Sequence, residues 1–131
     1  MSWLVTGGAG YIGAHVVRAL TTAGSSVVVI DDLSTGLAHF VPDDVPLITA
    51  TLLDTDAVRT TLTDHGVTGV IHIAGYKYAG ESVKRPLHTY RQNVSAMASL
   101  LEAMVDTRVG QLVFSSSAAT YGTPDVEVVD E

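Results

Sequence analysis

Hydrophobic residues in this chain fall into short continuous runs, separated by stretches whose apolar residues recur at helical spacing. Runs dense in β-branched residues predict strands at 3–6, 26–31, 46–50, 69–74 and 111–117. Continuous apolar runs are typical of strands that helices cover on both faces. Strands that alternate with helices, joined by right-handed crossovers, predict a doubly wound parallel α/β sheet.

Three intervening stretches carry the apolar spacing of helices. The first covers 12–23 and is followed by Gly24, and the second is closed by Gly66, because glycine suits the residue after a helix. The third should start near Pro86 and continue as one long helix. Its expected apolar face comprises Leu87, Tyr90, Val94, Met97, Leu100, Leu101 and Met104.

The composition narrows the class of protein. The 131 residues predict one domain, and 47% apolar with 16% charged residues predicts a folded core. A net charge of −7 argues against a surface for DNA or RNA. The chain has no cysteine, no secretory leader and no apolar run near ~18 residues, so we expect a cytoplasmic protein without membrane contact. Its five histidines are scattered, so no metal site is predicted.

The stretch VTGGAGYIG, directly after the first predicted strand, carries the most specific pattern. Gly8, Gly10 and Gly13 match G-x-G-x-x-G, and Gly7, Gly10 and Gly13 match G-x-x-G-x-x-G equally well. Residues without side chains let the loop turn tightly and let a diphosphate reach the amides that open the next helix. Asp31 follows at the end of the second strand, where it can accept hydrogen bonds from ribose hydroxyls. The sequence therefore predicts a dinucleotide site.

A second glycine-rich stretch, GYKYAGES at 75–82, has the glycine spacing of a P-loop. Glu81 stands where a P-loop carries its phosphate-binding lysine, and a carboxylate there would repel phosphate. We therefore exclude ATP or GTP hydrolysis at this stretch.

Five motifs taken together resemble one family. VTGGAGYIGAH, DDLSTG, VIHIAGYKYAGESV, PLHTY and FSSSAATYG are similar, in order, to the N-terminal part of UDP-galactose (UDP-glucose) 4-epimerases. These enzymes are extended short-chain dehydrogenase/reductases. The resemblance implies a Rossmann-like fold, a tightly held NAD and epimerisation at C4 of UDP-glucose or UDP-galactose. It covers nearly the whole chain.

The same resemblance implies roles for individual residues. Those implied to contact NAD are Gly7, Gly10, Tyr11, Ile12 and Gly13 at the diphosphate, Asp31, Asp32, Leu33, Ser34, Thr35 and Gly36 around the adenosine ribose, and Thr51, Leu52, Ile73, Ala74, Gly75, Lys77 and Gln92 elsewhere. Ser117 matches the catalytic hydroxyl, with a turn-forming hydroxyl as the alternative, and Lys77 has an ordinary surface amine as its alternative. Tyr121 is not expected to be the base, because Asp125 stands where a lysine should follow.

The chain departs from the family pattern in three places. Thr51 replaces the aspartate expected to hold the adenine, and Gln92 replaces an asparagine. The catalytic Tyr-x-x-x-Lys pair is expected about twenty residues beyond Tyr121, whereas the sequence ends at Glu131. Residues 1–131 are therefore interpreted as an incomplete NAD-binding domain, ending after about five strands, without the catalytic pair or a substrate domain.

Three functions remain open at this point. The favoured one is the cofactor half of an epimerase whose complete chain takes a UDP-sugar; this part alone should be inactive. The alternatives are a non-catalytic dinucleotide-binding module and another sugar-nucleotide enzyme, such as a dehydratase or decarboxylase. NAD should be preferred over NADP, because no Lys or Arg stands between Arg18 and Arg59 to meet a 2′-phosphate. The open edge after the fifth strand should expose apolar surface and favour self-association, for example as a homodimer.

Overall fold

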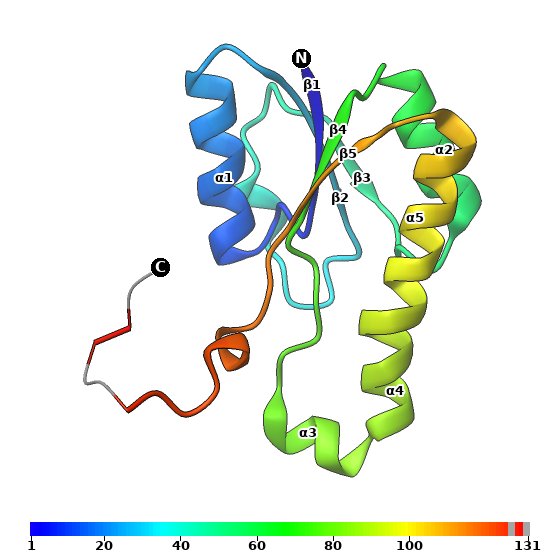
Figure 1. The fold of residues 1–131 in the computed structure, drawn as a ribbon. Coiled ribbons are helices and arrows are strands. Elements are labelled where there is room, and N and C mark those ends of the chain that lie inside the picture. The colour runs from blue at the N-terminus through cyan, green and yellow to red at the C-terminus, as the bar shows by residue number, and fades with distance from the viewer. Residues whose placement is uncertain (126–127, 130–131) are drawn as a thin grey trace.

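Five parallel strands form one sheet in the order β3-β2-β1-β4-β5 in the computed structural model (Figure 1). The structure describes residues 1–125, 128 and 129. The strands are β1 (Ser2–Thr6), β2 (Ser26–Asp31), β3 (Leu47–Thr49), β4 (Gly69–His72) and β5 (Gln111–Phe114). The helices are α1 (Tyr11–Thr22), α2 (Thr55–Asp64), α3 (Ala79–Lys84), α4 (Pro86–Tyr90) and α5 (Ala96–Thr107). The predicted doubly wound parallel sheet is confirmed.

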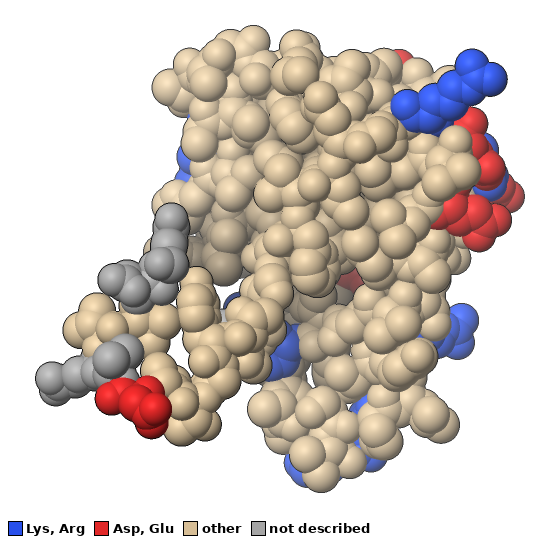
Figure 2. All heavy atoms as spheres, viewed as in Figure 1, with Lys and Arg blue, Asp and Glu red and all other residues tan. Residues whose placement is uncertain are grey.

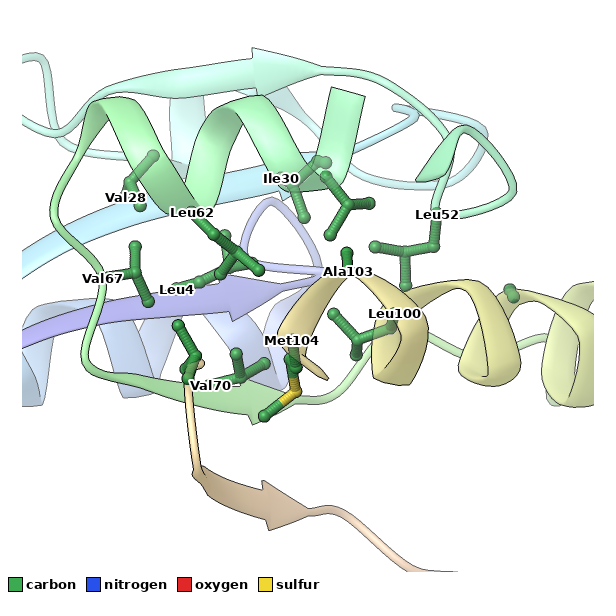
Figure 3. Packing of buried hydrophobic residues seen from close by; sticks show 13 residues of the cluster. Leu4, Val28, Ile30, Leu52, Leu62, Val67, Val70, Leu100, Ala103 and Met104 are labelled. Atoms are coloured by element: carbon green, nitrogen blue, oxygen red, sulfur yellow. The ribbon is translucent and has the colours of Figure 1, made fainter. Parts of the chain in front are cut away.

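Helices cover both faces of the sheet, so the alternate residues of each strand enter two separate cores. Helix α1 covers one face, where Val5 and Val29 pack against Val17. Helices α2 and α5 cover the other face, where Leu4, Ile30 and Val70 of the strands meet Leu62 and Leu100 of the helices (Figure 3). This double burial explains why the strands are apolar without alternation.

The register of the central strands aligns their carboxyl ends. Thr6, the last residue of β1, pairs with Ile30 of β2 on one side and with His72 of β4 on the other. The chain runs outward from β1 through β2 to β3, and then returns to place β4 on the opposite side of β1. The loops after β1 and β4 therefore diverge at a switch point, which is where open α/β sheets bind ligands.

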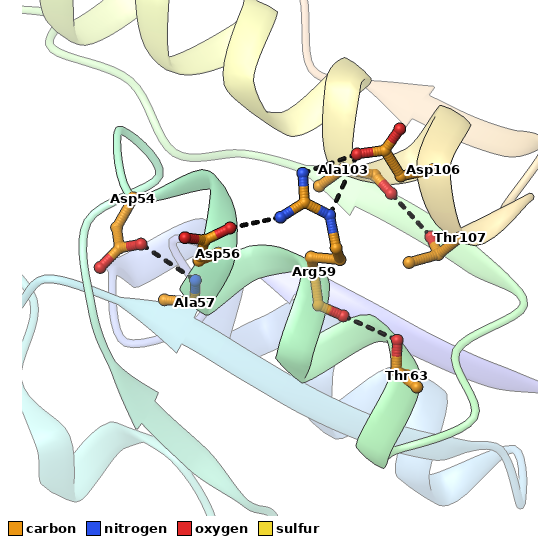
Figure 4. Close-up of polar contacts among 8 residues, drawn as sticks. All are labelled: Asp54, Asp56, Ala57, Arg59, Thr63, Ala103, Asp106 and Thr107. Carbon is orange, nitrogen blue, oxygen red and sulfur yellow. Dashed lines mark hydrogen bonds and ion pairs between the residues drawn. The ribbon is translucent and has the colours of Figure 1, made fainter.

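Polar contacts join α2 to α5 at the surface (Figure 4). The Arg59 guanidinium donates to Asp106 Oδ2 from Nε at 3.0 Å and from its second terminal nitrogen at 2.6 Å, and it also pairs with Asp56. The carboxylate of Asp54 accepts from the backbone N–H of Ala57 at 3.0 Å and so caps the start of α2. The contacts between Arg59 and Asp106 hold α2 against α5 in the layer outside the sheet.

The third predicted helix differs from its expected form. Helix α3 was not predicted, and the segment from Pro86 is interrupted by a turn of π-helix at 91–95 before α5 begins. The single long apolar face is wrong in its first half, where Leu87 is 85% exposed and Tyr90 is 63% exposed. It is also wrong at Leu101, which is 41% exposed, whereas Leu100 is fully buried. Only the α5 half has α2 and the sheet to pack against.

Three strands are shorter than predicted, and the difference lies mainly at their carboxyl ends. Strands β4 and β5 end at His72 and Phe114, so 73–74 and 115–117 leave the sheet and form loops. Strand β3 covers only the middle of its expected run. These released residues supply much of the site described below.

The surface divides into charged and uncharged regions. Figure 2 shows charged side chains gathered near the edge formed by α2 and α5 and around α3, with a largely uncharged centre. The edge strand β5 exposes Val113 and Phe114, each by more than half, as expected of an open sheet edge. No helix within the described residues is both long and apolar enough to cross a lipid bilayer.

Candidate functional site

A cavity of about 750 Å³ lies at the carboxyl ends of the strands. The loops after β1, β2, β3, β4 and β5 all contribute to its wall, together with the start of α1 and the π-helical turn. The predicted site residues that line it are Gly7, Gly10, Tyr11, Ile12, Gly13, Asp31, Asp32, Ser34, Thr35, Gly36, Thr51, Leu52, Ile73, Ala74, Gly75, Lys77, Gln92 and Ser117. Leu33 is the exception, because its side chain packs against the α1-side core.

The glycine loop is held so tightly that side chains would not fit. Gly7 adopts φ +71°, and a Cβ there would stand 2.8 Å from the backbone nitrogen of Ala74. A Cβ on Gly13 would overlap the carbonyl oxygen of Gly7, and one on Gly8 would stand 2.6 Å from Val29. Gly7 and Gly13 are therefore required for close backbone contact, while Gly8 serves packing against β2.

The start of α1 suits an anion. Gly10 occupies the cap position, and within the described residues no side chain caps this end or places a carboxylate in its first turn. The first amides of a helix have no partner inside the helix, and the helix dipole makes this end positive. These amides face a cavity whose wall includes Gly10, Tyr11 and Ile12. An arrangement of this kind suits phosphate groups.

Asp31 connects the glycine loop to the loop after β2. Its Oδ2 accepts from the backbone N–H of Ala9 at 3.0 Å, and its Oδ1 accepts from that of Leu33 at 2.9 Å. Asp32 accepts from the backbone and the hydroxyl of Ser34. Carboxylate oxygens accept more than one hydrogen bond each, so Asp31 retains capacity for hydroxyls of a ligand.

An asparagine holds the loop after β4 from the side of the long helix. Asn93, in the π-helical turn, accepts from the backbone N–H of Tyr76 at 2.7 Å and donates from Nδ2 to its carbonyl oxygen at 3.0 Å. This pair of bonds fixes the backbone beside Gly75 and Lys77. A π-helical turn is frequent at functional sites, and here it brings the amide of Asn93 to the loop.

Ser117 lies at the cavity wall after β5. Its hydroxyl oxygen accepts from the backbone N–H of Ala119 at 3.2 Å and caps the turn Ala118–Tyr121. Thr120 donates its hydroxyl to the Ser117 carbonyl oxygen within the same turn. The Ser117 hydroxyl therefore makes the turn contact that the alternative reading expected. Its catalytic role remains a prediction.

Several cavity residues were missed by the sequence analysis. Tyr76, Tyr78 and His88 form a cluster of edge-on aromatic contacts. The ring centroid of Tyr76 lies 5.4 Å from that of Tyr78 and 5.0 Å from that of His88. His72 and Phe114, the last residues of β4 and β5, stack at 5.7 Å. The signal that could have found His72 and Phe114 was their position at the carboxyl ends of two neighbouring strands.

The charges at the cavity are few and of both signs. Lys77 is the one Lys or Arg among the described residues that line it, and Asp31 and Asp32 lie across from the glycine loop. The imidazole of His72 is 4% exposed, and burial lowers its pKa from the usual value. Among the described residues, no three side chains of the metal-binding types gather as a metal centre requires.

Comparison with known proteins agrees with this geometry. The family described as "NAD dependent epimerase/dehydratase family" matches residues 3–131. The chain belongs to this epimerase/dehydratase family. Among curated members, the UDP-glucose 4-epimerase of Lactobacillus helveticus is 48% identical over 124 residues, covering 95% of this chain and 38% of the relative. That of Corynebacterium glutamicum is 44% identical over 131 residues, covering 100% of this chain and 39% of the relative.

Solved members of the epimerase/dehydratase family have the same fold. The UDP-glucose 4-epimerase of Thermus thermophilus in complex with NAD has a TM-score of 0.93 and 38% identity, covering 100% of this chain and 43% of that one. The enzyme from Brucella ovis in complex with NAD has a TM-score of 0.91 and 40% identity, covering 99% and 40%. The chain therefore spans about two fifths of the length of the relatives it matches.

Proposed function

We propose that this chain is the NAD-binding part of a UDP-glucose/UDP-galactose 4-epimerase. The observation that carries the proposal is one cavity that combines the start of α1, which no side chain of the described residues caps, with Lys77 and Ser117. The similarity to UDP-glucose 4-epimerases that were solved with NAD supports it. When bound there, NAD would supply the hydride acceptor and donor for reversible oxidation at C4 of the sugar.

The chain's own residues would bind and orient these ligands. The amides at the start of α1 would hold the diphosphate, with Gly7, Gly10 and Gly13 leaving room for it. Asp31 would accept hydrogen bonds from the adenosine ribose. Residues 32–36 would surround the same ribose, and Leu33 would contribute only its backbone. The cofactor would also contact Thr51, Leu52 and Gln92. Thr51 and Gln92 stand where the family pattern has an aspartate and an asparagine. Ile73, Ala74 and Gly75 would line the β4 side.

Two polar groups remain for the sugar side of the cavity. Lys77 would place a positive charge beside the reacting part of the cavity, and Ser117 would help a base take up and return a proton at the sugar's 4-hydroxyl. The base itself is expected to be the tyrosine of a Tyr-x-x-x-Lys pair, which these 131 residues do not contain. We therefore expect the 131-residue chain to bind NAD and to leave UDP-sugars unchanged.

The cofactor choice tests the proposal on this chain directly. A 2′-phosphate would face Asp31 and Asp32, and the one Lys or Arg among the described residues that line the cavity is Lys77, in the loop after β4. Like charges about 4 Å apart repel by about 4 kcal/mol at an effective dielectric constant of about 20. Water screens these partly exposed groups, so we expect calorimetric titration to give NAD at least about tenfold tighter than NADP. Equal affinities, or no binding of either cofactor, would refute the cofactor assignment.

Asp31→Ala should narrow this preference, and Asp43→Ala is the matched control. Replacing Asp43 makes the same change in net charge as replacing Asp31. Asp43 is exposed and lies outside the cavity, so it should not affect the cofactor directly. Because Asp31 also holds the amides of Ala9 and Leu33, its loss will weaken NAD binding as well; the ratio of the two affinities is the measurement. An unchanged ratio in Asp31→Ala would remove Asp31 from the ribose site.

Ser117 is tested in the protein encoded by the complete reading frame. Ser117→Ala should lower kcat for UDP-galactose by roughly 10²–10⁴-fold, the range for loss of one acid–base participant. Thr120→Val is the matched control, because it removes a side-chain bond of the same turn without touching the cavity. If Thr120→Val lowers kcat as much as Ser117→Ala, the serine acts only through the turn.

Location and assembly complete the proposal. A cytoplasmic location is supported by the absence of cysteine from the 131 residues. A homodimer is supported by apolar side chains exposed on α4 and β5, including Leu87, Tyr90 and Phe114. Light scattering of the purified protein should give twice the monomer mass; a monomer at high concentration would contradict this assembly.

A further inference from the structure

The buried imidazole of His72 has no part in the chemistry proposed above, although it lies at the centre of the site. His72 ends β4, is 4% exposed, and lines the cavity. Its Nδ1 is 2.8 Å from the Oγ1 of Thr6, the residue that ends β1 and precedes the glycine loop. The two side chains therefore join the two strands between which the switch point lies.

The neighbours of the Thr6 hydroxyl determine where its proton points. Oγ1 accepts from the backbone N–H of Ile73 at 3.2 Å and of Ala74 at 3.3 Å. It shares both N–H groups with the carbonyl oxygen of Thr6, which accepts from them at 3.2 and 3.1 Å. A hydroxyl oxygen that accepts twice has its one hydrogen left to donate. The nearest acceptor is Nδ1 of His72, and donation to it corresponds to the neutral imidazole tautomer that carries its hydrogen on Nε2. Burial lowers the pKa of His72 and so favours this neutral form.

One further contact holds the imidazole, and another holds the backbone of His72. The ring of His72 stacks on that of Phe114, with centroids 5.7 Å apart and planes 13° from parallel. The backbone carbonyl of His72 accepts from the N–H of Ser115 at 3.0 Å. The side chain is therefore oriented by β5 and acts on β1.

The amides that Thr6 holds belong to the segment against which the glycine loop packs. A Cβ on Gly7 would stand 2.8 Å from the nitrogen and 2.9 Å from the Cα of Ala74, so these two backbones touch. A small shift of Ala74 must therefore move Gly7 or open a gap beside it. The contacts form one continuous series from His72 through Thr6 and Ala74 to the loop that faces the phosphates.

We propose that His72 is a positioning residue of the dinucleotide site, which acts through the Thr6 hydroxyl to hold the turn at Ile73 and Ala74 against the glycine loop. The ligand class is a dinucleotide, so this inference rests on the proposed function. His72 itself need not touch the cofactor. Its effect is to keep the turn and the glycine loop at the separation that binding requires.

Paired substitutions separate the hydrogen bond from the bulk of the side chain. His72→Asn keeps an acceptor near the position of Nδ1, whereas His72→Phe keeps a ring and has no acceptor. Thr6→Ser keeps the hydroxyl, and Thr6→Val removes it at nearly constant shape. Thr61→Val is the matched control, because Thr61 is equally buried and its hydroxyl donates to Ala57 within α2, outside the cavity.

Three measurements are made on each variant: amide hydrogen exchange at Ile73 and Ala74 by NMR, NAD affinity by calorimetry, and the free energy of unfolding by urea. We expect His72→Phe and Thr6→Val to speed exchange at these two amides and to weaken NAD binding about tenfold, the effect of one lost hydrogen bond. His72→Asn and Thr6→Ser should stay within about threefold of the wild type. Thr61→Val should lose stability alone.

The inference is overturned if His72→Phe matches the wild type in exchange and affinity, or if Thr61→Val reproduces its effects at equal stability. If Thr6→Val does not fold, the comparison of His72→Asn with His72→Phe decides. A wild-type chain that does not bind NAD refutes the proposed function. Exchange at Ile73 and Ala74 still decides this inference in that case, because it is measured without ligand.

Discussion

Replacing Gly13 by alanine should destabilise the chain, although the same change favours most helices. Gly13 lies in the first turn of α1, where a methyl group would overlap the carbonyl oxygen of Gly7 and stand 2.7 Å from the Cα of Gly8. Neither backbone can retreat, because Gly7 already abuts Ala74 and Gly8 abuts Val29. The overlap is therefore relieved by moving α1 away from the sheet.

The size of the effect follows from these contacts. Overpacking of a well-packed interior costs about 1–3 kcal/mol, and the upper half of that range applies where the obstructing atoms are backbone. Alanine recovers at most about 1 kcal/mol through its higher helix propensity. Moving α1 also loosens Val17, which is fully buried against the sheet. We expect a net loss of about 2 kcal/mol, which lowers Tm by about 6–10 °C for a chain of this size.

Gly80→Ala is the matched control for this prediction. Gly80 is also helical, in α3, and a Cβ there would meet no atom within 4 Å. Its substitution should leave the free energy of unfolding unchanged or raise it by at most about 1 kcal/mol. Urea denaturation of both variants measures the difference. If Gly13→Ala is as stable as the wild type, the packing argument for the glycine loop is refuted.

Two further predictions concern charged groups. Burial lowers the pKa of His72 in the folded chain, so below the usual value of 6.5 the unfolded chain binds more protons, and the free energy of unfolding should fall as the pH drops through this range. Urea denaturation at several pH values measures this dependence. His72→Phe should make the free energy of unfolding depend less on pH, and an unchanged dependence would contradict the prediction. The Arg59–Asp106 pair on α2 and α5 is exposed, so a double-mutant cycle should give a small favourable coupling that declines as salt is added; a coupling insensitive to salt would contradict an exposed ion pair.

The sheet could be predicted from the sequence because burial on both faces imposes one residue type on the strands. The runs around Leu4, Val28 and Val70 are apolar at every position, which few other structures require. The glycine loop could be predicted for the same kind of reason. A backbone that must approach both a ligand and Ala74 excludes side chains at fixed spacings.

The long third helix could not be predicted in the same way. Its apolar residues have one spacing throughout, yet those of α4 remain exposed while Leu100 and Met104 of α5 are buried, since periodicity does not say which neighbours are present. The contacts of Asn93 with Tyr76 and of His72 with Thr6 were also out of reach, because each pair lies at least 17 residues apart in sequence. A polar pair of this kind depends on the fold that brings it together.

The π-helical turn at 91–95 amounts to one residue more than a regular helix needs over this length. A π-turn accommodates the extra residue locally, so removing one would join α4 and α5 as one regular helix and would redirect the side chains within the turn, Asn93 among them. The shortened segment would be a regular helix with better backbone geometry, and its amide at Asn93 would no longer face Tyr76. Chain length at this point is therefore itself a determinant of the site: a one-codon deletion would leave every side chain that lines the cavity encoded, and would separate the helix from the loop that it holds.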